Sequence, residues 1–179
     1  MEVSLGKSKK ILITGGARSG KSQYALNMAA SYGKRKGYLA TAQPFDQEMR
    51  QRIENHRRMR GKDWITVEEP LQVSQVLKEI DESCDVVILD CLTLWISNLL
   101  SNYKTDQRGI IDEIRKLAQS TREFKGTLVI VSNEVGMGIV PQNGLSRQFR
   151  DLAGYANQKI AEVADEVIMM VSGIPLKVK

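Results

Sequence analysis

The chain has 179 residues, of which 42% are hydrophobic and 26% charged, a globular composition that excludes fibrous and disordered classes and suits one domain with a single core. The net charge of +5 is compatible with nucleic acid and with small anionic substrates, so charge alone does not choose between them. The apolar runs are too short to span a membrane, and the first ten residues lack the apolar stretch of a signal peptide, so we expect a cytoplasmic protein without a membrane span.

Strand-length apolar runs alternate with segments of helical period, which indicates a parallel sheet with crossover helices. In chain order we expect a strand at 11–14, a helix over 24–32, a strand at 38–41, a helix over 47–60 capped by Asp46, a strand at 64–67 and a helix over 73–80. A strand at 86–89, near the centre of the sheet, a helix over 92–100, a helix over 110–118, a strand at 128–132, a helix over 149–160 and a strand at 167–171 follow. After Gly173 and Pro175, residues 174–178 are expected to fold back as an antiparallel edge strand.

The first expected strand runs directly into a phosphate-binding motif. The segment matches GxxxxGK[ST] with a strand before it and a helical period after it, and it comprises Gly15, Gly16, Ala17, Arg18, Ser19, Gly20, Lys21 and Ser22. Its glycines let backbone N–H groups and the helix N-terminus surround the phosphates of a nucleotide. Lys21 would meet the β- and γ-phosphates, and Ser22 would ligate Mg²⁺. The alternative is a glycine-rich turn, which a complete motif in register disfavours.

Asp90 ends the apolar run at 86–89, at the carboxyl end of a parallel strand, where ligands of such sheets bind. A P-loop enzyme requires a carboxylate near its Mg²⁺, and Asp90 is the candidate. The alternative is that Asp90 caps the helix that starts near Leu92, and the two roles can coexist.

His56 is the only histidine of the chain. On a helix from about residue 47 it shares the inward-facing side with Met49 and Ile53. Arginines surround it in sequence, an arrangement that suits a polyphosphate, and a neutral imidazole has a free nitrogen that can attack phosphorus. The alternative is a structural histidine beside a solvated basic face.

Polar residues and two glycines follow the strand at 128–132, so they emerge at the same edge of the sheet as the phosphate-binding loop. Asn133 and Glu134 are therefore candidates for binding the acceptor substrate. An ordinary loop with a local side-chain turn explains the same residues almost as well.

Taken together, four segments resemble one family. They are GGARSGKS, the DQEM segment leading to Arg52, Ile53 and His56, the DCLT segment from Asp90, and SNEVGMGIVP from Ser132. The chain resembles the bifunctional adenosylcobinamide kinase / adenosylcobinamide-phosphate guanylyltransferase family of cobalamin biosynthesis. The similarity runs from Ile11 to Lys179, so residues 1–10 are an N-terminal extension and residues 11–179 a single domain.

The resemblance implies two reactions. The first phosphorylates the aminopropanol arm of adenosylcobinamide with ATP or GTP, and the second moves GMP from GTP through a guanylylated His56 to give adenosylcobinamide-GDP and pyrophosphate. It also implies Mg²⁺, a homotrimer, and a P-loop NTPase-type α/β three-layer fold with a mostly parallel sheet and a C-terminal antiparallel hairpin. Beyond the phosphate-binding loop, the nucleotide contacts implied are Thr41, Ala42, Gln43, Arg57, Arg58, Met59, Arg60, Glu68 and Asp90.

Several points stay open from the sequence. The kinase step could use ATP or GTP or be lost, its general base could be Asp90 or Glu134, and the subunits that build each site are unspecified. For one site to react at both the α- and the γ-phosphorus, either the nucleotide binds in two registers or the helix that carries His56 moves. A monofunctional P-loop kinase and a regulatory nucleotide-binding protein are alternatives. A nucleic-acid-dependent ATPase is a third, but no basic stripe interleaved with aromatic residues supports a nucleic-acid partner.

Overall fold

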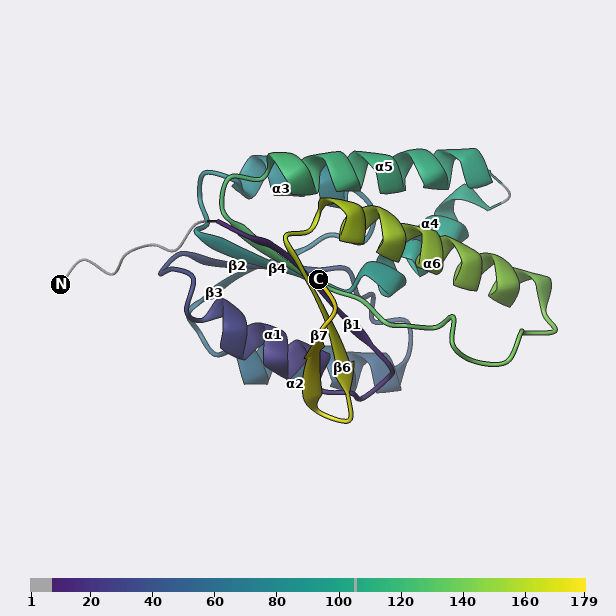
Figure 1. Ribbon diagram of the computed structural model, residues 1–179, viewed down its shortest axis with the longest axis horizontal. Coiled ribbons are helices and arrows are strands. Elements are labelled where there is room, and N and C mark those ends of the chain that lie inside the picture. Colours follow the sequence, from purple (N-terminus) through teal and green to yellow (C-terminus); the bar gives the residue numbers. More distant parts are fainter. Residues whose placement is uncertain (1–7, 105) are drawn as a thin grey trace.

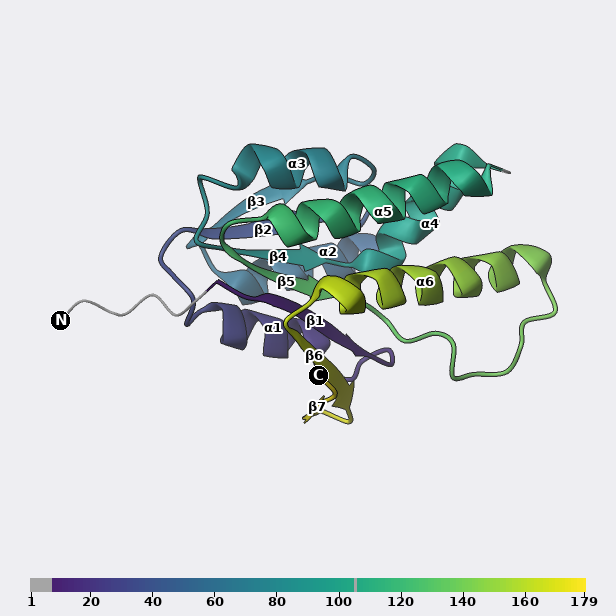
Figure 2. The same cartoon turned by 45° about the horizontal axis from the view of Figure 1, so that its top comes forward.

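The computed structural model describes residues 8–104 and 106–179 and has three layers, a seven-stranded sheet between two layers of helices (Figures 1 and 2). The strand order is β3-β2-β4-β5-β1-β6-β7. All neighbours are parallel except the last pair, β6 and β7. The strands are β1 (Lys10–Gly15), β2 (Lys36–Ala40), β3 (Trp64–Glu68), β4 (Val86–Asp90), β5 (Thr127–Val131), β6 (Glu166–Val171) and β7 (Ile174–Lys177).

The helices separate into two groups (Figure 2). One face of the sheet carries α3 (Val73–Ile80), α4 (Leu92–Tyr103), α5 (Gln107–Glu123) and α6 (Gly144–Val163), and the other carries α1 (Lys21–Ala29) and α2 (Gln47–Arg60). Within the described residues no helix is long and apolar enough to cross a bilayer.

The core forms because the strands β1, β2, β4 and β5 are apolar on both faces. Along β4, Val87 and Leu89 pack toward the layer of α3 to α6, whereas Val86 and Ile88 pack toward α1. The same alternation along β1, β2 and β5 divides the core into two clusters. These four strands are thereby fixed in register, and with them the loops at their carboxyl ends.

The α/β fold with a mostly parallel sheet and a C-terminal antiparallel hairpin is confirmed, and each expected element is present. Some bounds differ. β4, expected near the centre of the sheet, lies beside the middle strand β5, and α1 covers Lys21–Ala29 rather than 24–32. Helices α5 and α6 begin before the apolar period does, at Gln107 and Gly144, where Asp106 and Asn143 cap their first turns. Residues 1–7 of the expected N-terminal extension lie outside the described residues, and β1 starts at Lys10, one residue earlier than expected.

Candidate active site

The phosphate-binding loop connects β1 to α1, and glycine conformations shape both of its ends. Gly15 has φ 143°, and a Cβ there would lie 2.4 Å from the Met170 carbonyl oxygen, so no other residue fits. Gly20, with φ 90°, is the N-cap of α1. The loop therefore ends on exposed helix N–H groups, the arrangement that binds anions.

Lys21 folds back into this loop. Its Nζ donates to the Gly16 carbonyl oxygen at 2.5 Å and lies 3.4 Å from Ser19 Oγ, and the residue is 7% exposed. Burial lowers the pKa of Lys21, while the nearby Cys91 and Asp90 oppose that shift. An anion in the loop would offer the ammonium group a stronger partner than a carbonyl oxygen.

Three side chains from different elements converge on one oxygen of Asp90. The Tyr38 hydroxyl, from β2, donates to Oδ2 at 2.5 Å, and Ser22 Oγ, from α1, lies 3.4 Å from it. Nδ1 of His56, from α2, lies 3.3 Å from the same oxygen. The histidine and the phosphate-binding loop, far apart in the sequence, therefore meet at the carboxyl end of β4.

The Asp90 side chain is only 10% exposed, yet its neighbours favour its charged form. Burial alone raises the pKa of the Asp90 carboxyl, but hydrogen bonds from His56 and Tyr38, with a smaller contribution from Ser22, outweigh burial and hold the pKa below its ordinary value. The carboxylate is thus an acceptor at neutral pH.

His56 is placed by a helix that packs lightly on the sheet. Asp46 caps α2 by accepting the Met49 N–H at 2.7 Å, as the sequence predicts. Met49, Ile53, His56 and Arg60 are half-buried and every other residue of α2 is exposed, which confirms that His56 shares the inward side. The imidazole keeps 27% of its surface exposed, so a substrate can reach it.

Arg60, one turn after His56, lies against the Tyr38 ring of β2. Its guanidinium carbon is 3.8 Å from the centroid of the Tyr38 ring, and Trp64 meets the same ring edge-on at 6.2 Å. Tyr38 therefore binds Asp90 through its hydroxyl and α2 through its ring. From the sequence, Tyr38 is expected only as a strand residue. Its position in the strand was the available signal. Tyr38 pairs with Ile88, and Asp90 lies two residues after Ile88, so Tyr38 and Asp90 share one face of the sheet.

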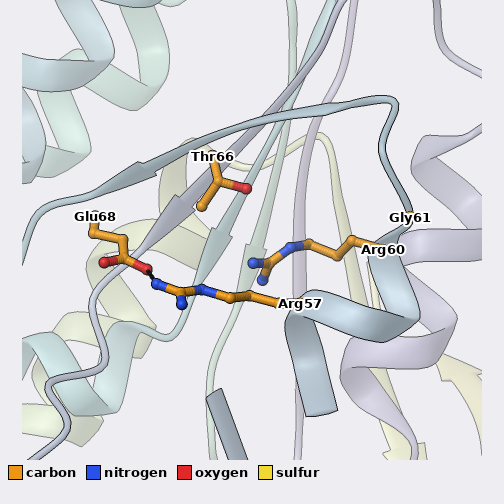
Figure 3. Close-up of a pocket in the computed structure, with 5 residues that line it drawn as sticks. All are labelled: Arg57, Arg60, Gly61, Thr66 and Glu68. Carbon is orange, nitrogen blue, oxygen red and sulfur yellow. Dashed lines mark hydrogen bonds and ion pairs between the residues drawn. The ribbon is translucent and has the colours of Figure 1, made fainter. Parts of the chain in front are cut away.

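A cavity of about 510 Å³ opens beside this helix end (Figure 3). Figure 3 shows Arg57 pointing across it to Glu68, with which it forms an ion pair, and Arg60 alongside. Gly61 and Thr66 complete the lining. Arg57, Arg60 and Glu68, all predicted nucleotide contacts, are thus brought together around one space.

The other two predicted contacts on α2 lie on its outer side. Arg58 forms an ion pair with Glu54 at 3.0 Å, one turn earlier on the helix, and Met59 is 50% exposed. Neither residue lines the cavity. The structure therefore does not bring Arg58 and Met59 together with the other predicted contacts.

Thr41, another predicted nucleotide contact, is fully buried. Its Oγ1 accepts the Cys91 N–H and donates to the Cys91 carbonyl oxygen, both at 2.8 Å, and its own carbonyl oxygen accepts from Asn98 at 2.8 Å. All of its polar groups are used within the protein, so its side chain fastens the end of β2 to the residue after Asp90. Ala42 and Gln43, which follow it, are half-buried.

Asn133 and Glu134 emerge at the same sheet edge as the phosphate-binding loop, as predicted, since the Glu134 N–H donates to the Gly15 carbonyl oxygen at 3.0 Å. Asn133 Nδ2 donates to Thr93 Oγ1 at 2.9 Å. The Glu134 carboxylate accepts from Gly136 N–H at 2.7 Å, so the local turn foreseen as the alternative is also present. Both side chains remain half-buried at the rim.

A glycine-bounded phosphate-binding loop between the first strand and helix of a parallel sheet, with an ionised aspartate at the end of a nearby strand, defines a P-loop nucleotide-binding protein. The chain belongs to the cobinamide kinase / cobinamide phosphate guanyltransferase family, whose model matches residues 11–178. The resemblance and the bifunctional enzyme class predicted from the sequence are therefore confirmed.

Two curated relatives agree with this assignment, and one solved structure shares the fold. The chain is 43% identical to the bifunctional adenosylcobalamin biosynthesis protein CobP of Pseudomonas aeruginosa, over 94% of this chain and 96% of that protein. It is 41% identical to the corresponding protein CobU of Escherichia coli, over 94% and 99% of the two chains. Its fold is similar to the crystal structure of the flagellar accessory protein FlaH from Methanocaldococcus jannaschii, with a TM-score of 0.51 at 15% identity over 96% of this chain and 78% of that one.

Proposed function

We propose that the enzyme phosphorylates adenosylcobinamide with ATP or GTP and then transfers GMP from GTP, through a covalent bond to His56, to the new phosphate. The products of the second reaction are adenosylcobinamide-GDP and pyrophosphate. The single observation that carries the proposal is the convergence of His56 and Ser22 on Asp90, because it puts a nucleophilic side chain beside a triphosphate-binding loop.

The kinase reaction uses the phosphate-binding loop. Gly15 to Ser22 surround the β- and γ-phosphates, and Lys21 exchanges its carbonyl partner for a phosphate oxygen. Ser22 and Asp90 offer two oxygen ligands 3.4 Å apart, which fits Mg²⁺, since this ion takes one or two protein ligands and completes its shell with phosphate and water. When bound, Mg²⁺ neutralises charge on the phosphates. Within the described residues no larger cluster of metal-ligating side chains is present.

The guanylyltransferase reaction uses α2 and the cavity. Arg57, Arg60 and Glu68 line a space that is large enough for a nucleotide fragment, two of them cationic and one anionic. The arginines suit phosphate, and the Glu68 carboxylate can accept the two N–H groups on the edge of guanine, which adenine lacks. The buried Thr41 hydroxyl holds Cys91, the residue after Asp90, by two hydrogen bonds. Ala42 and Gln43, which follow Thr41, are proposed to contact the nucleotide.

Asn133 and Glu134 are the proposed contacts of the cobinamide acceptor at the rim. We further propose that the chain works as a homotrimer in the cytoplasm on small-molecule substrates, without a nucleic-acid partner. Size-exclusion chromatography with light scattering, at several protein concentrations, tests the trimer.

Incubation with GTP labelled at the α-phosphate tests the central step. We expect a covalent label that is acid-labile and base-stable, as a phosphoramidate is, and we expect His56→Ala to abolish it. Asn55→Ala, at the exposed neighbour of His56 on α2, is the matched control and should be labelled normally. His56→Ala should still transfer the γ-phosphate to cobinamide. A label of normal intensity on His56→Ala would refute the covalent histidine.

A further inference from the structure

The geometry points to Asp90 as the positioning residue that holds His56 by its Nδ1–H and leaves Nε2 as the nitrogen that attacks phosphorus, with Tyr38 in turn holding Asp90. This inference rests on the proposed function of His56 and goes beyond it, because it assigns the attacking atom and two further residues.

The protonation pattern follows from the acceptor. A carboxylate at its ordinary pKa accepts hydrogen bonds and has none to donate at neutral pH, so a group that bonds to Oδ2 presents a hydrogen. The Tyr38 hydroxyl at 2.5 Å and the Ser22 hydroxyl at 3.4 Å can do so by rotation. Nδ1 of His56, 3.3 Å away, does so only in the tautomer that carries its proton on Nδ1. In the neutral imidazole, Nε2 then carries the lone pair.

Tyr38 keeps this acceptor in place. The tyrosine is 3% exposed, lies against Arg60 and Trp64, and directs its hydroxyl to the same oxygen that faces His56. Asp90 is also fixed through its backbone, since its carbonyl oxygen accepts the Thr41 N–H at 3.0 Å. The carboxylate thus has little freedom to turn, whereas the imidazole sits on a lightly packed helix.

The bond changes balance without a proton transfer. The Nε2 lone pair forms a bond to the α-phosphorus of GTP, the bond from that phosphorus to the oxygen bridging to the β-phosphate breaks, and pyrophosphate leaves with the electron pair. Nδ1 keeps its hydrogen throughout, so the substituted imidazole becomes cationic beside the Asp90 carboxylate. Attack by a phosphate oxygen of cobinamide phosphate then returns the electron pair to Nε2.

Because the chain has a single histidine, ¹⁵N-labelled histidine gives one pair of imidazole nitrogen signals. Long-range ¹H–¹⁵N spectra of the free wild-type enzyme, at a pH where the ring is neutral, should show a protonated Nδ1 and an unprotonated Nε2. Asp90→Asn, whose amide can donate to Nδ1, should shift the ring toward the other tautomer and slow guanylylation by roughly 10²–10⁴-fold. Tyr38→Phe keeps the ring and should cause a smaller shift.

Glu54→Gln is the matched control, because it removes a carboxylate from the same helix that pairs with Arg58 and not with His56. It should leave both the tautomer and the labelling rate unchanged. In the trapped intermediate, ³¹P–¹⁵N coupling should place the phosphorus on Nε2.

The two proposals fail separately. A wild-type ring protonated on Nε2, an unchanged tautomer in Asp90→Asn, or phosphorus on Nδ1 would overturn the positioning role while leaving a covalent histidine intact. A correct tautomer without any α-phosphate label would instead overturn the covalent histidine.

Discussion

Replacement of Thr41 by valine should destabilise the protein although valine has nearly the same shape and is more apolar. Thr41 is fully buried, and its hydroxyl forms two hydrogen bonds to Cys91. The Cys91 carbonyl oxygen also accepts the Trp95 N–H at 3.1 Å and stays paired in the variant, whereas the Cys91 N–H loses its partner.

The magnitude follows from these contacts. An unpaired buried N–H costs about 1–3 kcal/mol, and the lost hydrogen bond to the carbonyl oxygen about 0.5–1.5 kcal/mol. The extra methyl group returns about 0.8 kcal/mol. The net loss of unfolding free energy is thus about 2 kcal/mol, which at an m-value of about 2 kcal/mol/M lowers the urea midpoint by about 1 M.

Urea unfolding followed by tryptophan fluorescence measures this change, with Thr41→Ser as the control that keeps both hydrogen bonds and loses only a methyl group. Since valine is the more apolar residue, a Thr41→Val protein as stable as the wild type or more so would refute the reasoning. The same variant should also guanylylate more slowly, because the hydroxyl fastens the residue next to Asp90.

Gly15→Ala should lower the unfolding free energy by on the order of 2–3 kcal/mol in urea titrations, because its Cβ would meet the Met170 carbonyl oxygen at a strained φ, whereas Gly16→Ala, with no atom within 4 Å, should be nearly neutral. Side-chain and backbone hydrogen bonds from Arg35 hold the pKa of Asp85 below its ordinary value, so its ionised form stabilises the fold at and above pH about 4. The difference in urea stability between wild type and Asp85→Asn should therefore be full at pH 7 and shrink as the pH falls through the lowered pKa; an equal difference at pH 3 would contradict this. Glu68→Gln should weaken GTP binding by about tenfold in calorimetry and leave ATP binding unchanged, since the amide accepts only one of the two guanine N–H groups well; an equal loss for both nucleotides would exclude base recognition by Glu68.

The phosphate-binding motif could be predicted because its sequence signal is local. Its glycines, its lysine and the flanking strand and helix are contiguous from residue 10 to residue 29. The Asp46 cap of α2 is local in the same way. The need for glycine at residue 15 is not local, since it depends on the Met170 carbonyl oxygen of β6. Strand assignment succeeded because the inner strands are apolar on both faces, which is a strong local signal.

The meeting of His56 with Asp90 could not be derived from spacing. It depends on the parallel pairing of β2 with β4, which brings Tyr38 and Asp90 to one face, and on the path of α2 across that face. Thr41 shows a second limit, because the family resemblance implied it as a nucleotide contact, whereas the sequence did not reveal that its buried hydroxyl bonds the Cys91 backbone. The burial of a polar side chain at a strand end depends on how the strands pair, and the sequence of one segment does not reveal that pairing.

The two halves of the site differ in how firmly they are held, and this bears on how one enzyme serves both the α- and the γ-phosphorus. The phosphate-binding loop and Asp90 are anchored to buried strands, so a change in their spacing would disturb the core. No residue of α2 is buried. Besides the half-buried Met49 and Ile53, three polar contacts hold this helix: the His56 contact to Asp90, the Arg57 ion pair with Glu68 and the stacking of Arg60 on Tyr38. A bound nucleotide can replace each of these contacts, since its phosphate oxygens can accept hydrogen bonds from the arginines and its phosphorus can bond to the imidazole. Displacement of α2 therefore exposes little apolar surface, and each polar contact that it breaks is replaced by a contact with the nucleotide. Movement of this helix thus costs less free energy than a change in the phosphate-binding loop, and it lets one site serve the α-phosphorus and the γ-phosphorus in turn.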